Sequence, residues 1–183
     1  MKNIKSSLLI RGRRIYLRKI SLKDINKDYI SWMNDAQVVR FLESRFQKWS
    51  IKKIKAYVKE VKNKPDYLFL AIVLNNGKKH IGNIKIGPIN LNHNFADMGL
   101  IIGEKSYWGQ GFATEAIKLI TDYAFNELSL HKITAGVYSN NIGSIKAFKK
   151  AGFVVEAVRK KHYLYKDKYV DAVLLSNTQK RSL

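Results

Sequence analysis

The stretch Tyr107-Trp108-Gly109-Gln110-Gly111-Phe112-Ala113-Thr114-Glu115-Ala116 decides how the chain around it folds. It follows an apolar run, Met98 to Gly103, that is typical of a buried strand. The apolar residues after it have the spacing of one helix face, namely Ala113, Ile117, Ile120 and Ala124. Two glycines therefore lie where a strand gives way to a helix N-terminus.

This junction favours an anion as its ligand. Glycine tolerates positive φ and lets another molecule approach the backbone closely. The first turn of a helix has unpaired N–H groups at the positive end of the helix dipole. The pattern therefore predicts a site for a phosphate or a pyrophosphate. A glycine-rich turn that binds nothing is the alternative that two glycines alone leave open.

The order of predicted elements indicates a mixed α/β fold in one domain over residues 14–176. Residues 1–13 are expected to be a leader and residues 177–183 a tail. Strands are predicted over 14–20, 67–74, 79–86, 96–103, 132–138, 153–159 and 169–175. Helices are predicted over 22–33, 51–64, 113–124 and 141–151, with one further short turn within 36–42. A loop through Pro88, Asn90 and Asn92 is expected before the strand 96–103, and a basic, tyrosine-rich loop between the last two strands.

The composition limits the classes of function. The chain has 183 residues, no cysteine and a net charge of +20, and it lacks an apolar run of the roughly 18 residues that a membrane span needs. We therefore expect a soluble cytoplasmic protein. A basic surface attracts nucleic acid, anionic membranes or phosphorylated small molecules. Because the excess charge is mostly lysine and is spread along the chain, a solvated surface is favoured, without a specific nucleic-acid or membrane partner.

At these motifs the chain resembles the GNAT superfamily of acetyl-CoA-dependent N-acetyltransferases, from about Arg14 to Ser176. The segment Trp108 to Ala113 is similar to the family's acyl-CoA signature, an Arg or Gln followed by x-x-Gly-x-Gly/Ala. The pair Asn141-Ile142-Gly143-Ser144 and Ala151-Gly152-Phe153 is typical of the branch with ribosomal-protein N-terminal, spermidine and nucleotide-amino-sugar acetyltransferases. The resemblance implies a GNAT-like fold, with a mixed, mostly antiparallel sheet flanked by helices.

The resemblance also implies acetyl-CoA as co-substrate and a set of residues that bind it. Backbone groups of Ile101, Ile102 and Gly103 are expected to face the pantetheine arm, and residues from Trp108 through Thr114 to hold the pyrophosphate. That loop comprises Trp108, Gly109, Gln110, Gly111, Phe112, Ala113 and Thr114. Asn141, Ser144 and Phe148 are expected further along the cofactor. Lys146, Lys149 and Lys150 either meet the 3′-phosphate or form a solvated helix face, which is favoured. The histidines are scattered without metal-ligand spacing, so no metal site is expected.

The family reaction transfers acetyl directly from the thioester to a neutral amine, so a base must take the amine's proton and the oxyanion must be stabilised. Asp97 matches the family's best-known catalytic carboxylate and is proposed as the base, directly or through water; a structural hydrogen bond is the alternative. Glu104 is the competing carboxylate. Ser144 resembles a serine that faces the CoA sulfur, although it could simply lie in a capped helix turn. Two positions depart from the family pattern: Trp108 replaces Arg or Gln, and Phe148 replaces a proton-donating Tyr.

The acceptor is expected among the first two helices and the last hairpin. Residues 29–35 with Phe41-Leu42-Glu43 look like a segment of enzymes that acetylate nucleotide-linked amino sugars, and we favour that substrate class. The alternatives are a protein N-terminal amine, as in ribosomal-protein acetylation, and a domain that senses acyl-CoA without turnover. A polyamine is disfavoured by the positive charge. A basic nucleic-acid-binding module is a further alternative, but the chain lacks the usual motifs of such modules. A homodimer is possible.

Overall fold

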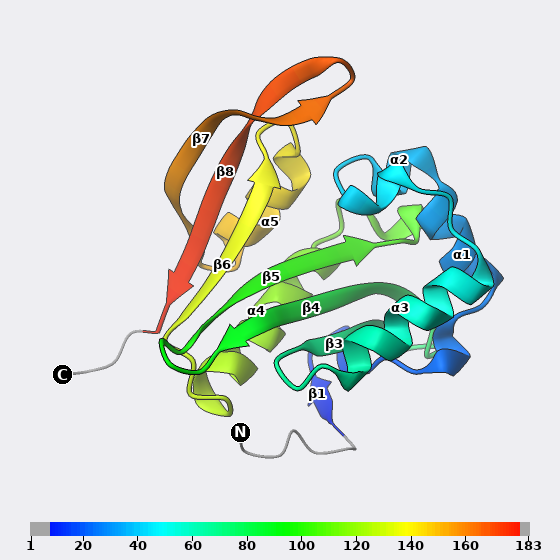
Figure 1. Cartoon of the computed structure of the whole chain (residues 1–183). Helices are drawn as coiled ribbons and strands as arrows, with labels where there is room; N and C mark the ends of the chain where they lie inside the picture. Colours follow the sequence, from blue (N-terminus) through cyan, green and yellow to red (C-terminus); the bar gives the residue numbers. More distant parts are fainter. Residues whose placement is uncertain (1–7, 180–183) are drawn as a thin grey trace.

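Eight strands within the described part of the chain form one sheet in the order β1-β2-β3-β4-β5-β6-β8-β7. The computed structural model describes residues 8–179 (Figure 1). All neighbouring strands are antiparallel except β5 and β6, which run parallel. The strands are β1 (Leu9–Arg11), β2 (Ile15–Lys19), β3 (Leu68–Leu74), β4 (His80–Asn90), β5 (Phe95–Ile102), β6 (Lys132–Tyr138), β7 (Val154–Tyr165) and β8 (Lys168–Thr178). The mixed, mostly antiparallel sheet predicted from the sequence is confirmed.

Helices cover both faces of the sheet (Figure 1). One face carries α4 (Phe112–Asn126) and α5 (Ile142–Lys150), and the larger apolar core lies beneath them. The other face carries α1 (Lys27–Asn34), α2 (Ala36–Val39) and α3 (Ile51–Asn63), over a second core. Three 3-10 turns, η1 (Leu22–Asp24), η2 (Glu43–Phe46) and η3 (Lys105–Tyr107), complete the elements. No helix within the described residues is long and apolar enough to cross a membrane.

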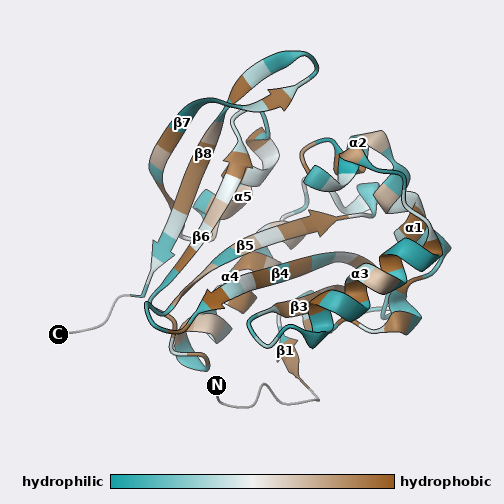
Figure 2. Ribbon diagram, viewed as in Figure 1, coloured by the Kyte–Doolittle hydropathy of each residue, from teal (hydrophilic) through white to brown (hydrophobic). Residues whose placement is uncertain are grey.

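Local sequence explains where the helices on the second face begin and which residues they bury. The Ser50 side chain accepts from the Lys53 amide at 3.3 Å and starts α3, which buries Ile54, Val58 and Val61. Hydrophilic residues cover much of the outward side of α3 (Figure 2). Ile51, which the helical spacing also places inward, is 46% exposed because the first turn of α3 extends past the core.

The predicted helix over 22–33 is divided into η1 and α1. The division arises because Asn26 caps α1 by accepting from the Tyr29 amide at 3.0 Å. Asp24, at the end of η1, is bound to β2 by Arg18, whose Nη1 donates to Asp24 Oδ2 at 2.7 Å. Burial would raise the pKa of Asp24, but the hydrogen bond from Arg18 and the Ser21 amide lower it.

Several strands extend further than the sequence predicts. β4 continues through a register shift between Ile86 and Ile89 to Asn90, so the expected loop begins only after that residue. Pro88 is tolerated because it lies at this irregularity. The basic, tyrosine-rich segment is not a loop: β7 runs to Tyr165, and Lys166 and Asp167 form a two-residue turn with positive φ at both positions. Residues 9–11 of the predicted leader form β1, and β8 reaches Thr178 of the predicted tail.

A half-buried histidine at the start of β4 makes stability depend on pH. The Nε2 atom of His80 lies 2.8 Å from the Gly82 carbonyl oxygen and 3.0 Å from Asn83 Oδ1, so it carries the proton of a neutral ring. Burial lowers the pKa of His80 below its usual 6.5. The unfolded chain therefore binds more protons near this pH, and stability is lost as the pH falls through the folded pKa.

We expect the melting temperature to fall when the pH is lowered from about 7.5 to about 5.5, and to fall less in His80→Asn, because the unfolded His80 takes up a proton near pH 6.5. Differential scanning calorimetry across this pH range measures the melting temperatures of the wild type and of His80→Asn. His93→Asn, at an exposed turn position, is the matched control and should keep the wild-type dependence. Equal pH dependence in wild type and His80→Asn would contradict the assignment.

Candidate active site

The two parallel strands diverge at the centre of the molecule. Their pairing covers only Phe95 with Lys132, Ala96 with Ile133 and Asp97 with Thr134. Beyond these pairs β5 continues to Ile102 and β6 to Tyr138, and the strands open into a V (Figure 1). The N-termini of α4 and α5 follow the carboxyl ends of these strands. Ligands of α/β proteins commonly bind at such a strand end, so this V is the candidate active site.

The glycine loop at the start of α4 has the geometry of an anion cradle. Gly109 and Gly111 have φ of 73° and 84°, and Gly111 is the N-cap of α4. A Cβ at Gly109 would meet no atom within 4 Å, so the space beside it is open. Within residues 8–179, no hydrogen-bond acceptor is found for the first-turn amides of Phe112, Ala113 and Thr114. The sequence predicts a diphosphate at these groups; the Phe112 side chain itself is buried.

A residue that sequence reasoning missed holds this loop in place. The Arg14 guanidinium donates to Glu115 Oε2 at 2.9 Å and to the Gln110 carbonyl at 2.8 Å, and lies 4.3 Å from the ring centroid of Phe112. Burial would raise the pKa of Glu115, but hydrogen bonds from the Arg14 backbone and side chain lower it. Arg14 thus joins β2 to the loop. Only the three-dimensional structure reveals this link, because 101 residues separate Arg14 from Glu115.

Trp108, at the position where the family has Arg or Gln, contacts β5. Its Nε1 donates to the Ile102 carbonyl at 2.7 Å. That carbonyl was expected to face the pantetheine arm, so in this structure it already has a protein partner. Gly103 packs closely beneath Trp32: an added Cβ would lie 2.1 Å from a ring atom. Ile101 lines the cleft described below.

The second predicted segment lies at the start of α5. Asn141 is the N-cap, and its Oδ1 accepts from the Ser144 amide at 3.3 Å. A Cβ at Gly143 would meet nothing within 4 Å, so this helix start is open. Phe148 is 2% exposed and packs edge-to-face on Phe153 at 5.0 Å. It therefore forms part of the core under the V and has no proton to give.

Asp97 is the last β5 residue before the strands diverge. Its side chain is exposed and accepts a hydrogen bond from the Thr134 hydroxyl on β6. Alternation along β5 places Asp97 on the same face as Gly99 and Ile101. The competing carboxylate, Glu104, is paired with Lys79 at 2.9 Å beyond the end of β5.

A cleft of about 420 Å³ opens on this same face, between β5 and the helices of the second face. Gly99, Leu100 and Ile101 of β5 line it. The remaining lining residues come from β3, β4 and the segments around α1, η2 and α3: Tyr29, Met33, Leu42, Glu43, Ser44, Gln47, Trp49, Tyr57, Phe69, Asn83 and Lys85. We call it the acceptor cleft because a molecule in it would lie beside the V.

Residues of β6 and β7 border the V on the same side. Tyr138 of β6 donates to Glu43 Oε1 at 3.0 Å, and burial raises the pKa of the Tyr138 phenol above its ordinary value. Tyr163 of β7 stacks on Tyr138 at 4.1 Å, and its hydroxyl lies 3.3 Å from where a Cβ of Gly136 would be. Sequence reasoning did not find these tyrosines, because the segment around Tyr163 reads as a loop.

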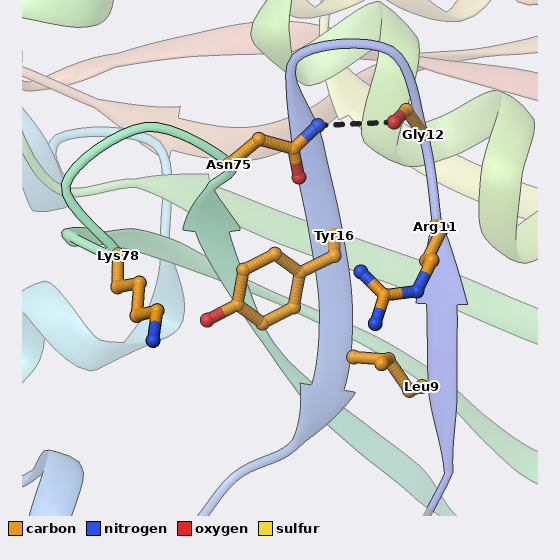
Figure 3. Close-up of a pocket in the computed structure, with 6 residues that line it drawn as sticks. All are labelled: Leu9, Arg11, Gly12, Tyr16, Asn75 and Lys78. Carbon is orange, nitrogen blue, oxygen red and sulfur yellow. Dashed lines mark hydrogen bonds between the residues drawn. The ribbon is translucent and has the colours of Figure 1, made fainter.

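A second hollow, of about 330 Å³, lies between the β1–β2 hairpin and the β3–β4 turn (Figure 3). In it the Asn75 side-chain amide donates to the Gly12 carbonyl at 3.1 Å, and the Tyr16 ring lies between Arg11 and Lys78 (Figure 3). None of the predicted site residues lines this hollow, so the V and the acceptor cleft remain the candidate site.

Comparison with known proteins agrees with this geometry. A family model described as "Acetyltransferase (GNAT) domain" matches residues 14–154. A probable N-acetyltransferase of Bacillus subtilis (strain 168), YjcK, is 28% identical, covering 91% of this chain and 97% of the relative. The spermidine N(1)-acetyltransferase of Escherichia coli (strain K12) is also 28% identical, covering 87% of this chain and 83% of the relative.

The fold has close counterparts among solved structures. Spermidine N-acetyltransferase from Vibrio cholerae, solved in complex with CoA and spermine, superposes with a TM-score of 0.81 at 22% identity. The superposition covers 92% of this chain and 97% of that one. The likeness therefore extends over nearly the whole fold.

Proposed function

This chain belongs to the GNAT acetyltransferase family, and we propose that it moves the acetyl group of acetyl-CoA directly to a primary amine that enters through the acceptor cleft. The family match makes the chain an N-acetyltransferase with acetyl-CoA as co-substrate. The observation that carries the proposal is the V between β5 and β6, which has an open glycine loop at one end and the acceptor cleft beside it.

The glycine loop and the two helix starts are proposed to hold acetyl-CoA. Amides from Gly109 to Thr114 would bind the diphosphate, since two positive-φ glycines and a helix N-terminus present N–H groups to it. Ile101 to Gly103 would lie beside the pantetheine arm, although the Ile102 carbonyl already accepts from Trp108 and the Gly103 amide already donates to the Ile81 carbonyl. Asn141, Ser144 and Phe148 lie across the V, and the Ser144 hydroxyl is proposed to stabilise the departing thiolate.

Asp97 is proposed to take the proton of the amine, directly or through one water. Its carboxylate is exposed on the face that carries the acceptor cleft, and the Thr134 hydroxyl orients it. The neutral amine then forms a C–N bond with the acetyl carbon as the C–S bond breaks, and the thiolate of CoA takes up a proton. No covalent bond to the protein is needed.

Three classes of amine are candidates for the acceptor. A nucleotide-linked amino sugar, the class favoured by the sequence, draws support from the net charge of +20. None of the relatives described above is named for such a sugar, and two are named for spermidine. A protein N-terminal amine remains a second candidate, because an open cleft of this size admits one terminal residue.

Release of free thiol from acetyl-CoA tests the proposed function. The assay uses a panel of amines: a UDP-linked amino sugar, a peptide with a free N-terminus, spermidine and several monoamines. We expect turnover with at least one amine and an acetamide product detectable by mass spectrometry. Binding of acetyl-CoA without turnover of any amine would instead support an acyl-CoA sensor, and the absence of acetyl-CoA binding would contradict the proposal.

Arg14→Met is expected to weaken acetyl-CoA binding about fivefold, because the glycine loop loses its link to β2. The effect is modest since the Arg14–Glu115 pair is partly exposed, and such pairs contribute roughly 1 kcal/mol or less. Isothermal titration calorimetry measures the Kd. Arg13→Met, at the exposed neighbouring position, is the matched control. Equal affinity in Arg14→Met and Arg13→Met would show that the link does not support the site.

A further inference from the structure

The chemistry of the acceptor cleft indicates the kind of amine it takes. We propose, on the premise of the function above, that the acceptor is a primary monoamine with a compact aromatic or branched apolar group, and that Glu43 is the counter-ion of its ammonium. The cleft has mostly apolar walls, one carboxylate and one cation among its lining residues.

The walls of the cleft are mostly apolar and are rigidly packed. Trp49 and Phe69 are 9% and 8% exposed, and each packs edge-to-face on Tyr57 with centroid distances of 6.0 Å. Met33 and Leu42 also line the space. Pockets of a few hundred Å³ with such walls bind small apolar groups, and a few polar groups set the orientation. The volume and lining therefore suit one ring or one branched chain.

Glu43 is the only carboxylate among the lining residues, and its hydrogen bond with Tyr138 places it beside β6. Its Oε1 accepts from Tyr138 of β6 at 3.0 Å, and the Tyr138 hydroxyl in turn accepts from Arg45 Nη1 at 2.8 Å. Arg45 Nη2 donates to the Leu164 carbonyl at 2.8 Å. Within residues 8–179, Glu43 forms no ion pair. Tyr138 orients the carboxylate of Glu43 and separates it from the Arg45 guanidinium, so the carboxylate can pair with an ammonium.

A second polar group beside Glu43 lacks a partner. The Ser44 hydroxyl is buried in the cleft wall, and no hydrogen-bond partner for it exists among the described residues. Glu43 and Ser44 are consecutive in η2, but the Ser44 oxygen is not exposed to the cleft, so Glu43 alone is proposed to hold the ammonium.

The opposite wall disfavours both a second ammonium and a diphosphate. Lys85 is the only cation among the lining residues. It donates to the Tyr57 hydroxyl at 3.1 Å and lies over the rings of Tyr57 and Tyr67 at 5.7 and 5.4 Å. The second ammonium of a polyamine would meet this lysine and find no second carboxylate. A diphosphate would find one lysine that is already bound to a hydroxyl and two rings.

Steady-state kinetics with matched amines tests the proposal. The probes are 2-phenylethylamine, 3-methylbutylamine, spermidine, a UDP-linked amino sugar and a short peptide with a free N-terminus. We expect kcat/KM for the better of the two monoamines to exceed that for spermidine and for the UDP-linked sugar by at least about tenfold, because neither a second ammonium nor a diphosphate has a partner in the cleft.

Glu43→Gln should then lower kcat/KM for the preferred monoamine by about 10- to 100-fold, mainly through KM, because a hydrogen bond to a charged group is lost. The Kd of acetyl-CoA should not change. The neutral analogue 2-phenylethanol, used as a competitive inhibitor, should bind wild type and Glu43→Gln about equally. Glu60→Gln, an exposed carboxylate of α3 paired with Lys64, is the control and should match wild type.

The outcomes separate this inference from the proposed function. Preferred turnover of spermidine, of the UDP-linked sugar or of the peptide would overturn the monoamine assignment while leaving the acetyltransferase activity established. An unchanged KM for the monoamine in Glu43→Gln would remove Glu43 as the counter-ion. Binding of acetyl-CoA without acetylation of any probe would overturn both proposals.

Discussion

Gly111→Val is expected to abolish measurable binding of acetyl-CoA, with a loss of at least about 100-fold in affinity. Gly111 has a φ of 84° and begins α4, so a branched side chain there would be strained and would occupy the approach to the loop amides. A loss of this size corresponds to about 2.7 kcal/mol of binding free energy, which is consistent with the loss of several hydrogen bonds to a charged group. Calorimetric titration with acetyl-CoA provides the measurement.

Backbone strain alone must be separated from blocking of the site. Gly77→Val is the matched control, because Gly77 has a φ of 71° in the β3–β4 turn and a Cβ there would meet nothing within 4 Å. Both variants should lose stability by an order of about 1–3 kcal/mol. Only Gly111→Val should lose its affinity for acetyl-CoA. Wild-type affinity in a folded Gly111→Val protein would show that the diphosphate binds elsewhere.

Asp97→Asn should lower kcat/KM at pH 7 by about 100-fold, the lower end of what general bases contribute. Most primary amines are protonated at this pH, since their pKa is near that of lysine, about 10.4. The deficit should shrink as the pH rises toward that value, because the free amine no longer needs a base. Rates of thiol release between pH 7 and pH 10 give the profile.

Thr134→Val and Glu104→Gln are the controls for this experiment. Thr134→Val removes the hydroxyl that orients Asp97 but keeps the carboxylate, so its loss should be smaller and its pH profile close to wild type. Glu104→Gln removes a carboxylate that is paired with Lys79 beyond β5 and should have little effect on the rate. A constant ratio of wild-type to Asp97→Asn rates across the range would exclude Asp97 as the base.

The elements that could be predicted from the sequence are those whose determinants are local. The glycine loop, the Asn141 cap and the positive φ of Gly152, which is 93°, each follow from a residue's own backbone preference. The buried strand β3 follows from its continuous apolar run. The divergence of β5 and β6 could be expected only from the resemblance to the GNAT family, because no local pattern encodes it.

The parts that could not be predicted depend on contacts between distant segments. Glu43 and Tyr138 are 95 residues apart in the sequence, and no local pattern in either segment predicts their hydrogen bond. The turn at Lys166 and Asp167 has positive φ at two residues that rarely favour it, so β7 and β8 were predicted too short. On the acceptor side the sequence pointed to residues 29–35 and 41–43, several of which line the cleft, but not to Tyr138 or Tyr163; the cofactor residues stay predictions from their motifs.

A crystal structure of the protein with coenzyme A bound tests the central claim most directly. The account predicts diphosphate oxygens within about 2.7–3.2 Å of the backbone nitrogens between Gly109 and Thr114, with the sulfur between β5 and β6 beside the acceptor cleft. Coenzyme A bound elsewhere on the surface, or a V closed by protein side chains in the presence of the ligand, would contradict it.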